Sequence, residues 1–437
     1  MPTVLKYQYA FGTTSDIRYR TNNDVDTRLR DSLLVFSPQL DGILTYRPTA
    51  WLESTFEVIL EREFAVQEEN PVHLPTGELQ FAENRRLLLA LEQAFATFKP
   101  FGPVGPFELT VGRRNFEDGR QWLYDTALDV ASVRLRHSSF HTQLSVGRKD
   151  LVKVDILKQA RAGGLPVNID PASVGAEGRK TENFIFYTEY RGIEDIKLAA
   201  YTIYRNDRGG REGRPLWMGV RATGRPSDSF RFWGDLSILR GSDENQQTFR
   251  AHALDVGATY VFTGLPHYPT ITLGYAYGSG DGNRRDNRNS EFRQTGLQSN
   301  EGRFAGVSKF KYYGEVLDLE LSNVQILTAG FGFRPAANVY VDLVYHQYWL
   351  NKLADEIRNW ALTAQMSQVD THLSKDVGQA LDVVLGFRRL FGVKQLGMDL
   401  RMGWFFPGKA FLRDEGAVDP IIRRADNAFS LIFRVLF

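Results

Sequence analysis

Apolar and polar residues alternate along many short stretches of this chain. In the last ten residues, AFSLIFRVLF, a strand would place five large apolar side chains on one face, because successive side chains point to opposite sides: Phe429, Leu431, Phe433, Val435 and Phe437. Such a strand either covers the core of a soluble sheet or faces lipid in a membrane barrel. This segment alone is compatible with both.

The same period of two recurs in about eighteen segments, most of them near the 9 to 11 residues that a tilted strand needs to cross a bilayer. Clear examples are TITLGYAYG (270–278), VYVDLVYHQYW (339–349), ALDVVLGFRR (380–389) and MDLRMGWF (398–405). In each of them one face is apolar and the other is small or polar. The pattern predicts strands from one end of the chain to the other.

The connections between these segments alternate between short and long. The short links are 47–50, 99–105, 137–139, 191–195, 224–228, 263–269, 334–338 and 390–397, and the long polar stretches are 63–84, 115–126, 150–182, 205–214, 240–250, 279–307, 350–377 and 406–426. A barrel with both termini on one side places all its long loops at one rim, whereas a soluble sandwich has no reason to do so. We therefore predict an all-β fold, a single transmembrane antiparallel β-barrel of about 18 strands with short periplasmic turns and long extracellular loops, formed by residues 1–437 as one domain.

The charged residues indicate which face of each strand is turned inward. Arg or Lys facing lipid near the bilayer midplane costs about 2 to 4 kcal/mol. We therefore expect Asp342 and His346, and likewise Asp399 and Arg401, to face the lumen. Phe437 would then lie at the periplasmic rim, either as a C-terminal signal for the barrel-assembly machinery or as an interface anchor.

Composition narrows the choice of function. Lys and Arg (53) nearly balance Asp and Glu (52), so there is no overall attraction to nucleic acid or to an anionic membrane surface. Cysteine is absent, which excludes disulfides and Cys nucleophiles and suits an oxidising compartment. No run of 18 apolar residues predicts a transmembrane helix. The first residues do not read as a signal peptide, so we expect either that one was removed or that Met1 stands in its place.

Candidate catalytic and metal-binding motifs do not hold up. In RHSSFH, His137 and His141 flank a tight turn, and no third group is placed to orient a base. DGNRRDNRNSE (281–291) begins like a calcium loop, but Arg285 stands at the next ligand position. We expect no enzyme activity, cofactor or metal, and we predict a short loop helix within 353–364 from its apolar spacing. The lumen is then the place left for function.

From residue 292 onward, the chain resembles the alginate export family of outer-membrane β-barrels. The resemblance rests on QTGLQSN (294–300), YGEVLDLELSNVQ (313–325), LVYHQYW (343–349), DVGQALDVV (376–384) and GWFFPGKAF (403–411), with weaker similarity in VGRRNFEDGRQW (111–122) and GYAYGSG (274–280). It implies a monomeric 18-stranded barrel that exports an acidic polysaccharide. It also implies an arginine-rich constriction that attracts uronate carboxylates.

By position, the resemblance assigns the constriction to a set of charged residues: Arg113 or Arg114, Arg148 or Lys149, Lys309, Lys311 and Arg401, with Asp399 beside the last. Alternation along the strands favours Arg114, Lys149 and Arg401 as the lumen-facing members. Lys309 and Lys311 share the parity of Gln325, unless a bulge intervenes. The alternative for each is a rim side chain whose charge reaches water or lipid headgroups.

The chain also departs from the family pattern. The family's exporter has Arg just before ELSN, where this chain has Asp318 and Leu319, and an Arg-x-Arg pair where this chain has Asp399 and Arg401. A less basic pore follows. The exporter's long periplasmic turn, which closes its channel, is replaced here by RLFGVKQLGMD (389–399), which is too short to block a lumen. We therefore expect any gate to be an outer loop, with 150–182 and 279–307 as candidates.

These observations lead to three hypotheses. The preferred one is a passive, anion-selective channel in the bacterial outer membrane that exports an acidic polysaccharide or oligosaccharide, with outer-membrane lipids, the saccharide and the barrel-assembly machinery (through Phe437) as its partners. The second is a porin for the uptake of small anionic or sugar nutrients. The third is a membrane-embedded enzyme, which would need a catalytic cluster at one rim.

Overall fold

The structure is a computed structural model that describes residues 6–22, 25, 32–68, 87–100, 106–149, 181–207, 213–283, 285–358, 366, 374–411, 413–415, 421–423 and 427–437. Secondary structure in these ranges consists of strands and two short 3-10 turns, η1 (Leu390–Gly392) and η2 (Lys409–Phe411). Nowhere in the described part does a helix have the length and apolar character needed to span a bilayer.

Eighteen antiparallel strands form one continuous wall, as the alternating pattern predicts. Their bounds are β1 Lys6–Thr21, β2 Ser32–Thr49, β3 Leu52–Arg62, β5 Leu87–Phe98, β6 Phe107–Glu117, β7 Asp125–His137, β8 Phe140–Arg148, β9 Thr181–Ile193, β10 Ile196–Asp207, β11 Arg214–Ser227, β12 Phe230–Ser242, β14 Ala251–Val261, β15 Thr270–Gly278, β19 Val324–Ala336, β20 Val339–Leu350, β21 Asp376–Arg388, β22 Gly397–Pro407 and β25 Ala428–Leu436. The predicted all-β barrel of about 18 strands is confirmed.

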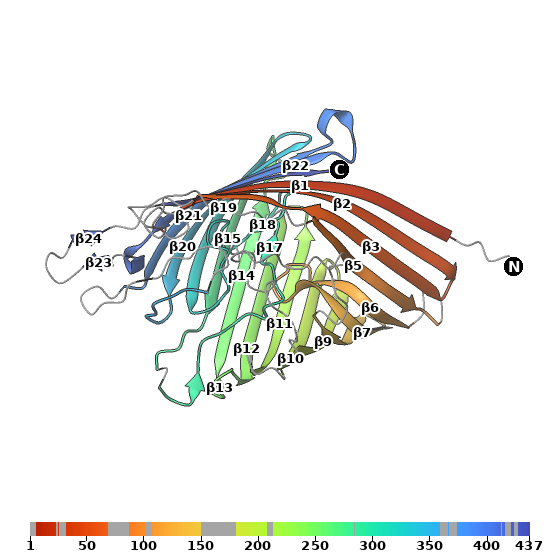
Figure 1. Cartoon of the computed structure of the whole chain (residues 1–437), viewed down its shortest axis with the longest axis horizontal. Helices are drawn as coiled ribbons and strands as arrows, with labels where there is room; N and C mark the ends of the chain where they lie inside the picture. Colours follow the sequence, from red (N-terminus) through yellow and green to blue (C-terminus); the bar gives the residue numbers. More distant parts are fainter. Residues whose placement is uncertain are drawn as a thin grey trace.

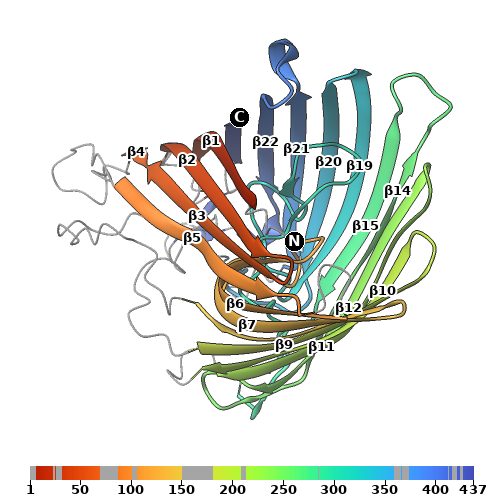
Figure 2. The same ribbon diagram turned by 90° about the vertical axis from the view of Figure 1, so that its right-hand side faces the viewer.

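The wall closes because its first and last strands pair. β1 runs antiparallel to β25 from Thr14↔Leu436 to Thr21↔Phe429, and the backbone of Thr13 exchanges two hydrogen bonds with Phe437, of 2.9 and 3.0 Å. Figures 1 and 2 show the strands wrapping around a common interior, with β1 and β2 as long ribbons beside the N-terminus. Closure leaves the barrel no free edge along β25.

Short and long connections alternate as expected. The short turns join β2 to β3, β5 to β6, β7 to β8 and so on to β21 and β22, and the start of β1 and the end of β25 lie on this side. Minor strands lie at the opposite end or in the lumen: β4 Phe64–Glu68, β13 Thr248–Phe249, β16 Arg288–Asn289, β17 Glu301–Gly302, β18 Phe310–Lys311, β23 Arg413–Glu415 and β24 Ile421–Arg423. We refer to the two ends as the short-turn rim and the long-loop rim.

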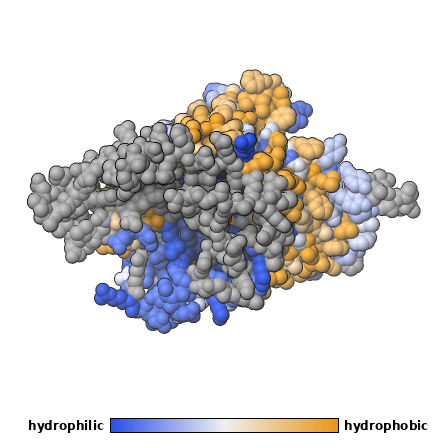
Figure 3. All heavy atoms as spheres, viewed as in Figure 1, coloured by the Kyte–Doolittle hydropathy of each residue, from blue (hydrophilic) through white to orange (hydrophobic). Residues whose placement is uncertain are grey.

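Side chains that point away from the lumen are largely apolar and exposed. Phe11, Leu40 and Leu273 are 81%, 57% and 60% exposed, respectively. In Figure 3 hydrophobic residues cover much of the right-hand part of the wall, and hydrophilic residues gather at the lower left, where β12 and β14 approach the long-loop rim. This band is what contact with acyl chains requires.

The four polar side chains expected to face inward do so. Asp342, His346, Asp399 and Arg401 are all buried, whereas their strand neighbours Leu343 and Tyr345 are exposed on the outer wall. The predicted loop helix is wrong where it can be seen, since Leu353 and Ile357 lie in non-helical chain. The remainder of that prediction, with Trp360 and Ala364, lies outside the described residues.

Candidate functional site in the barrel lumen

Most of the connection between β15 and β19 folds into the barrel, whereas residues 282–283 and 285–288 near its start are exposed. Its residues, 279–323, form what we call the lumen segment, in which β17 pairs with β18. Its apolar side chains are almost completely buried against inward-facing residues of the wall such as Ile203, Leu239 and Ile326: Phe292, Leu297, Phe310, Tyr312, Tyr313, Val316, Leu317, Leu319 and Leu321. Burial of this apolar surface holds the segment inside the barrel.

A second, shorter connection also enters the lumen. Residues 118–124 join β6 to β7, and there Asp118 accepts hydrogen bonds from the backbone N–H groups of Leu123 (2.8 Å) and Tyr124 (3.1 Å). The other carboxylate oxygen of Asp118 accepts a hydrogen bond from Arg221 of β11. Trp122 and Leu123, 2% and 1% exposed, pack in the same core as the lumen segment. The turn is therefore fixed to both the wall and the segment.

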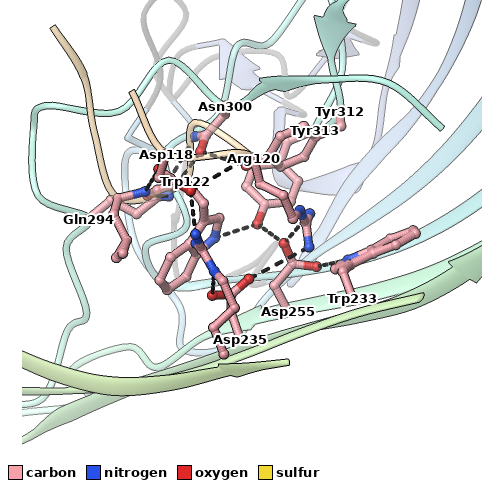
Figure 4. Close-up of polar contacts among 12 residues, drawn as sticks. Asp118, Arg120, Trp122, Trp233, Asp235, Asp255, Gln294, Asn300, Tyr312 and Tyr313 are labelled. Atoms are coloured by element: carbon pink, nitrogen blue, oxygen red, sulfur yellow. Dashed lines mark hydrogen bonds and ion pairs between the residues drawn. The ribbon is translucent and has the colours of Figure 1, made fainter. Parts of the chain in front are cut away.

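A buried polar network joins these two connections to the wall (Figure 4). Asp255 on β14 accepts hydrogen bonds from Arg120 (2.8 Å), Trp233 Nε1 (2.8 Å) and Tyr313 OH (2.8 Å). The hydroxyl of Tyr313 in turn accepts a hydrogen bond from Trp122 Nε1 at 2.9 Å. One carboxylate of the wall thus connects both inward-folded connections.

Arg120 lies at the centre of this network. Its guanidinium carbon is 4.7 Å from the ring centroid of Trp233 and 5.0 Å from that of Tyr312, and a guanidinium nitrogen lies 3.7 Å from Asp235. Burial disfavours its charge, but the carboxylates of Asp255 and Asp235 outweigh burial and raise the pKa of Arg120 above its ordinary value. The cation is therefore permanent.

A cavity of about 740 Å³ lies beside Arg120, between the lumen segment and the wall of β9 to β14. It extends to the turn between β9 and β10, so it belongs to the short-turn half of the lumen. Six cationic side chains line it, against two acidic ones: Arg120, Arg191, Lys197, Arg225, Arg231 and Arg303, with Glu194 and Asp195. Trp233 and Phe304, stacked with 5.8 Å between ring centroids, form an aromatic part of the lining.

Nearby carboxylates partly neutralise two of these cations. Arg191 forms an ion pair with Glu189, and Arg225 forms one with Asp228 at 2.9 Å. Both arginines stay about half exposed, with 48% and 53% of their side chains accessible. Exposed pairs of this kind are weak, so both cations stay available to an incoming anion.

The sequence left two choices open, Arg113 or Arg114 and Arg148 or Lys149, and in each pair one residue faces the lumen and the other faces outward. Arg114 lies over the ring of Phe95, at 5.2 Å, on the same inward face as Phe116. Lys149 donates a hydrogen bond to the carbonyl of Gly296 in the lumen segment, at 3.3 Å. Arg113 and Arg148 occupy the alternate, outward positions, so they do not line the lumen.

The other candidates hold the lumen segment in place. Arg401 lies 3.3 Å from Glu315 and 3.5 Å from Glu301. Asp399 accepts hydrogen bonds from Arg388 and Ser308, both at 2.6 Å. Arg401 and Asp399 are inward-facing residues of β22, and both are engaged by the segment.

Lys309 and Lys311 were expected to share the strand alternation of Gln325, and the structure places them elsewhere. They do not extend the strand that contains Gln325, because that strand, β19, begins at Val324, and both lysines belong to the lumen segment. Lys309 pairs with Glu117 at 2.6 Å and Lys311 with Asp318 at 2.9 Å. The reason is that residues 312–321 are apolar enough to pack in the interior and leave the wall.

Sequence reasoning missed the cations of the cavity. Arg191, Arg225 and Arg231 lie at inward positions of their strands, close to the short turns, and Lys197 lies at a bulge. The sequence did hold a signal for these residues: on neighbouring hairpins, a basic residue stands close to a short link, at a position whose side chain faces the lumen by strand alternation. Arg120 and Arg303 gave no such signal, because their placement depends on how the inward connections fold.

A closed barrel with an apolar outer band and a polar, charged cavity in its lumen is the architecture of an outer-membrane β-barrel protein. The alginate export family matches residues 2–421, and the chain belongs to that family. This agrees with the resemblance seen in the sequence and gives the protein an outer-membrane location.

The alginate production protein AlgE of Pseudomonas aeruginosa is 30% identical over 192 residues, which are 40% of this chain and 38% of that protein. AlgE of Azotobacter vinelandii is 28% identical over 156 residues, 32% of each chain. The chain thus spans between a third and two fifths of the length of the curated relatives it matches.

Solved structures with the same fold include two from Pseudomonas aeruginosa. OccK7 (OpdD) has a TM-score of 0.57 at 13% identity, covering 99% of this chain and 98% of that one. The outer membrane protein OpdK has a TM-score of 0.57 at 10% identity, with the same coverage. At these identities the likeness concerns the fold alone.

Proposed function

We propose that this protein is a passive outer-membrane channel that exports an acidic polysaccharide or oligosaccharide of the alginate type. Membership in the alginate export family supports the proposal, as does the similarity to two proteins named for alginate production. The observation that carries it is the cavity at the short-turn side of the lumen, where cations outnumber acids and aromatic rings form part of the lining. That side faces the periplasm, from which an exported polymer enters.

The chemistry of the cavity suits a uronate chain. Guanidinium groups bind carboxylates in a bidentate way, and both Arg231 of the wall and Arg303 of the lumen segment line the space. The rings of Trp233 and Phe304 offer flat apolar surfaces for the sugar rings. A channel substrate must also be able to leave, and the partly neutralised arginines at the mouth keep each contact weak.

A route through the lumen is expected along β1 to β3. On β19 to β22 the lumen-facing side chains are buried by the lumen segment, whereas on β1 the lumen-facing Arg18 is 48% exposed. Gln39 and Asp41 of β2 are likewise only half-buried. We propose that the polymer passes on this side, with Arg114 and Lys149 as the inward cations of the neighbouring wall, and that the lumen segment is the gate.

Planar bilayer recordings test this proposal. Uronate oligomers added on the short-turn side are expected to interrupt the ion current of the wild-type channel, and neutral oligosaccharides of equal length are not. The double variant Arg191→Gln/Arg225→Gln should weaken the block several-fold. The matched control Arg285→Gln removes an exposed cation of the long connection after β15 and should leave the block unchanged. Equal block by neutral and acidic oligomers would remove the proposal.

The cavity also supports a second candidate, a porin for small anionic or sugar nutrients. A volume of about 740 Å³ is within the range of small-molecule sites, and residues of the lumen segment form part of the lining of this cavity. Liposome swelling with monosaccharides and dicarboxylates separates the two functions. Rapid swelling with these solutes and no block by uronate oligomers would favour uptake.

A further inference from the structure

Four charged side chains form a row on the outer, lipid-facing wall. They are Arg113 of β6, Asp129 of β7, Arg148 of β8 and Glu182 of β9, and strand register pairs each one with the next. Arg113 lies 3.7 Å from Asp129, and Arg148 donates a hydrogen bond to Glu182. The row alternates signs across four adjacent strands.

Their outward direction follows from their neighbours. Leu128 and Val130, on either side of Asp129, belong to the core inside the barrel. Asn183, next to Glu182, accepts a hydrogen bond at 3.0 Å from Arg205, which also reaches the lumen segment at Thr295. The alternate positions must therefore point to the outside of the barrel.

The row also marks the edge of the apolar band on the side of the long-loop rim. The next outward residues toward the short-turn rim are Val111, Ala131, Val146 and Phe184, of which Val111, Val146 and Phe184 are 47%, 42% and 43% exposed. Arg148 is the last residue of β8 and Glu182 the second residue of β9, so the row lies at the long-loop end of these strands. Charges on the lipid face are tolerated at this height, where the headgroups begin, and not near the midplane.

A hollow lies next to the four charged side chains, on the side of the short-turn rim. It has a volume of about 410 Å³, and its apolar lining includes small residues, Ala94 and Ala131, together with Val111 and Val146. All four charged side chains border the same hollow. It lies where the wall is thinly paired, because the register between β5 and β6 ends at Ala94↔Arg113.

Arg113 has unused hydrogen-bonding capacity at this hollow. Its side chain is only 6% exposed, yet its Nε and Nη1 atoms make no hydrogen bond. A buried guanidinium with free donors is unfavourable unless a ligand supplies acceptors. Phosphate oxygens match the fork of an arginine, and Arg148, 31% exposed, is the second cation at the same edge.

We propose that this groove binds a phosphate-bearing lipid of the outer leaflet, with the headgroup phosphate on Arg113 and Arg148 and an acyl chain in the hollow of Ala94, Ala131, Val111 and Val146. The occupant is a lipid because the apolar hollow opens on the lipid-facing wall and the cations lie at headgroup height. Asp129 and Glu182 hold the two guanidinium groups in position. The inference rests on the outer-membrane location and does not require any particular substrate.

The test measures retained lipid by native mass spectrometry of the full-length protein in detergent, after incubation with a phosphorylated glycolipid of the outer leaflet. The wild type is expected to keep a bound lipid, and Arg113→Gln/Arg148→Gln to lose at least tenfold in occupancy. Arg114→Gln is the matched control, since it removes the adjacent arginine from the opposite, lumen face.

A second variant covers the case in which the double variant fails to fold. Ala131→Phe fills the hollow without changing a charge and should displace the lipid while the barrel keeps its resistance to SDS at room temperature. Equal lipid retention by all variants would overturn the proposal. Inorganic phosphate that protects the wild type against heat as well as the lipid does would overturn the assignment to a lipid.

Discussion

The ion pairs of Arg120 allow a quantitative prediction about the docking of the connection 118–124 and of the lumen segment that packs against it. With an effective dielectric constant of about 20, the attraction to Asp255 at 2.8 Å is about 6 kcal/mol, and that to Asp235 at 3.7 Å is about 4 kcal/mol. Desolvation of the three charges offsets most of this sum. Breaking such a buried pair by removing one partner typically costs about 3 to 5 kcal/mol.

The substitution Arg120→Met should fall at the low end of that range. Asp235 keeps its ion pair with Arg221, and Asp255 keeps the hydrogen bonds from Trp233 and Tyr313. A loss of about 3 kcal/mol corresponds to a roughly hundredfold larger population of the undocked segment, because about 1.4 kcal/mol is a factor of ten. The cost falls on the connection 118–124, and on the lumen segment through its contacts with that connection at Tyr312 and Tyr313, since the strands of the wall keep their own hydrogen bonds.

Two measurements check this prediction. Amide hydrogen exchange within 300–323 should speed up by about two orders of magnitude in Arg120→Met, while exchange in β19 to β21 stays unchanged. Single-channel recordings should show more frequent and larger openings. Arg288→Met, at an exposed arginine in the outer part of the same connection, serves as the control. Equal exchange in Arg120→Met and the wild type would refute the reasoning.

Three further results are expected. Gly112 has a φ of +125°, and an added Cβ would lie 2.3 Å from the carbonyl oxygen of Ala94. Gly112→Val should therefore destabilise the barrel by at least about 2 kcal/mol and lower its melting temperature in SDS. Gly234→Ala is the control and should leave the melting temperature unchanged, because its Cβ would meet only Val256, at 3.7 Å. Burial raises the pKa of Glu320 in the lumen segment above 4.5, so the docked state binds this proton more tightly than the undocked state does. Docking should therefore weaken as the pH rises from about 4.5 through the raised pKa. Hydrogen exchange of the wild type should show this pH dependence, and Glu320→Gln should lack the part that Glu320 contributes. Block by uronate oligomers should decline steeply between 0.1 and 1 M salt, about a threefold change in Debye length, and a salt-independent block would contradict an electrostatic site.

The wall could be predicted from the sequence because its signal is local. A period of two fixes the face of each residue, and the alternation of link lengths fixes the topology, so the inward position of Asp342 and Arg401 followed without any tertiary information. The same parity favoured Arg114 over Arg113, and Lys149 over Arg148. These are properties of a strand and its immediate neighbours.

The lumen could not be predicted in this way. The residues from Lys309 to Asn323 look like the start of a strand, and only the space available inside the barrel decides that they pack there. Arg120 becomes a central residue because Asp255 and Tyr312, more than 130 positions away in sequence, meet it in the folded protein. Interior packing and long-range ion pairs depend on the finished wall, which a sequence pattern does not describe.

The two hydrogen bonds between Thr13 and Phe437 have a kinetic consequence. The ring is completed by strands that lie more than 400 positions apart in the chain, so a nascent chain that has not yet reached β25 cannot close it. Entropy opposes joining ends that are separated by more than 400 residues, and such distant pairing is slow. Until β25 is in place, an open curved sheet persists with two unpaired edge strands, β1 and β22, and these edges would pair with other chains unless they are protected.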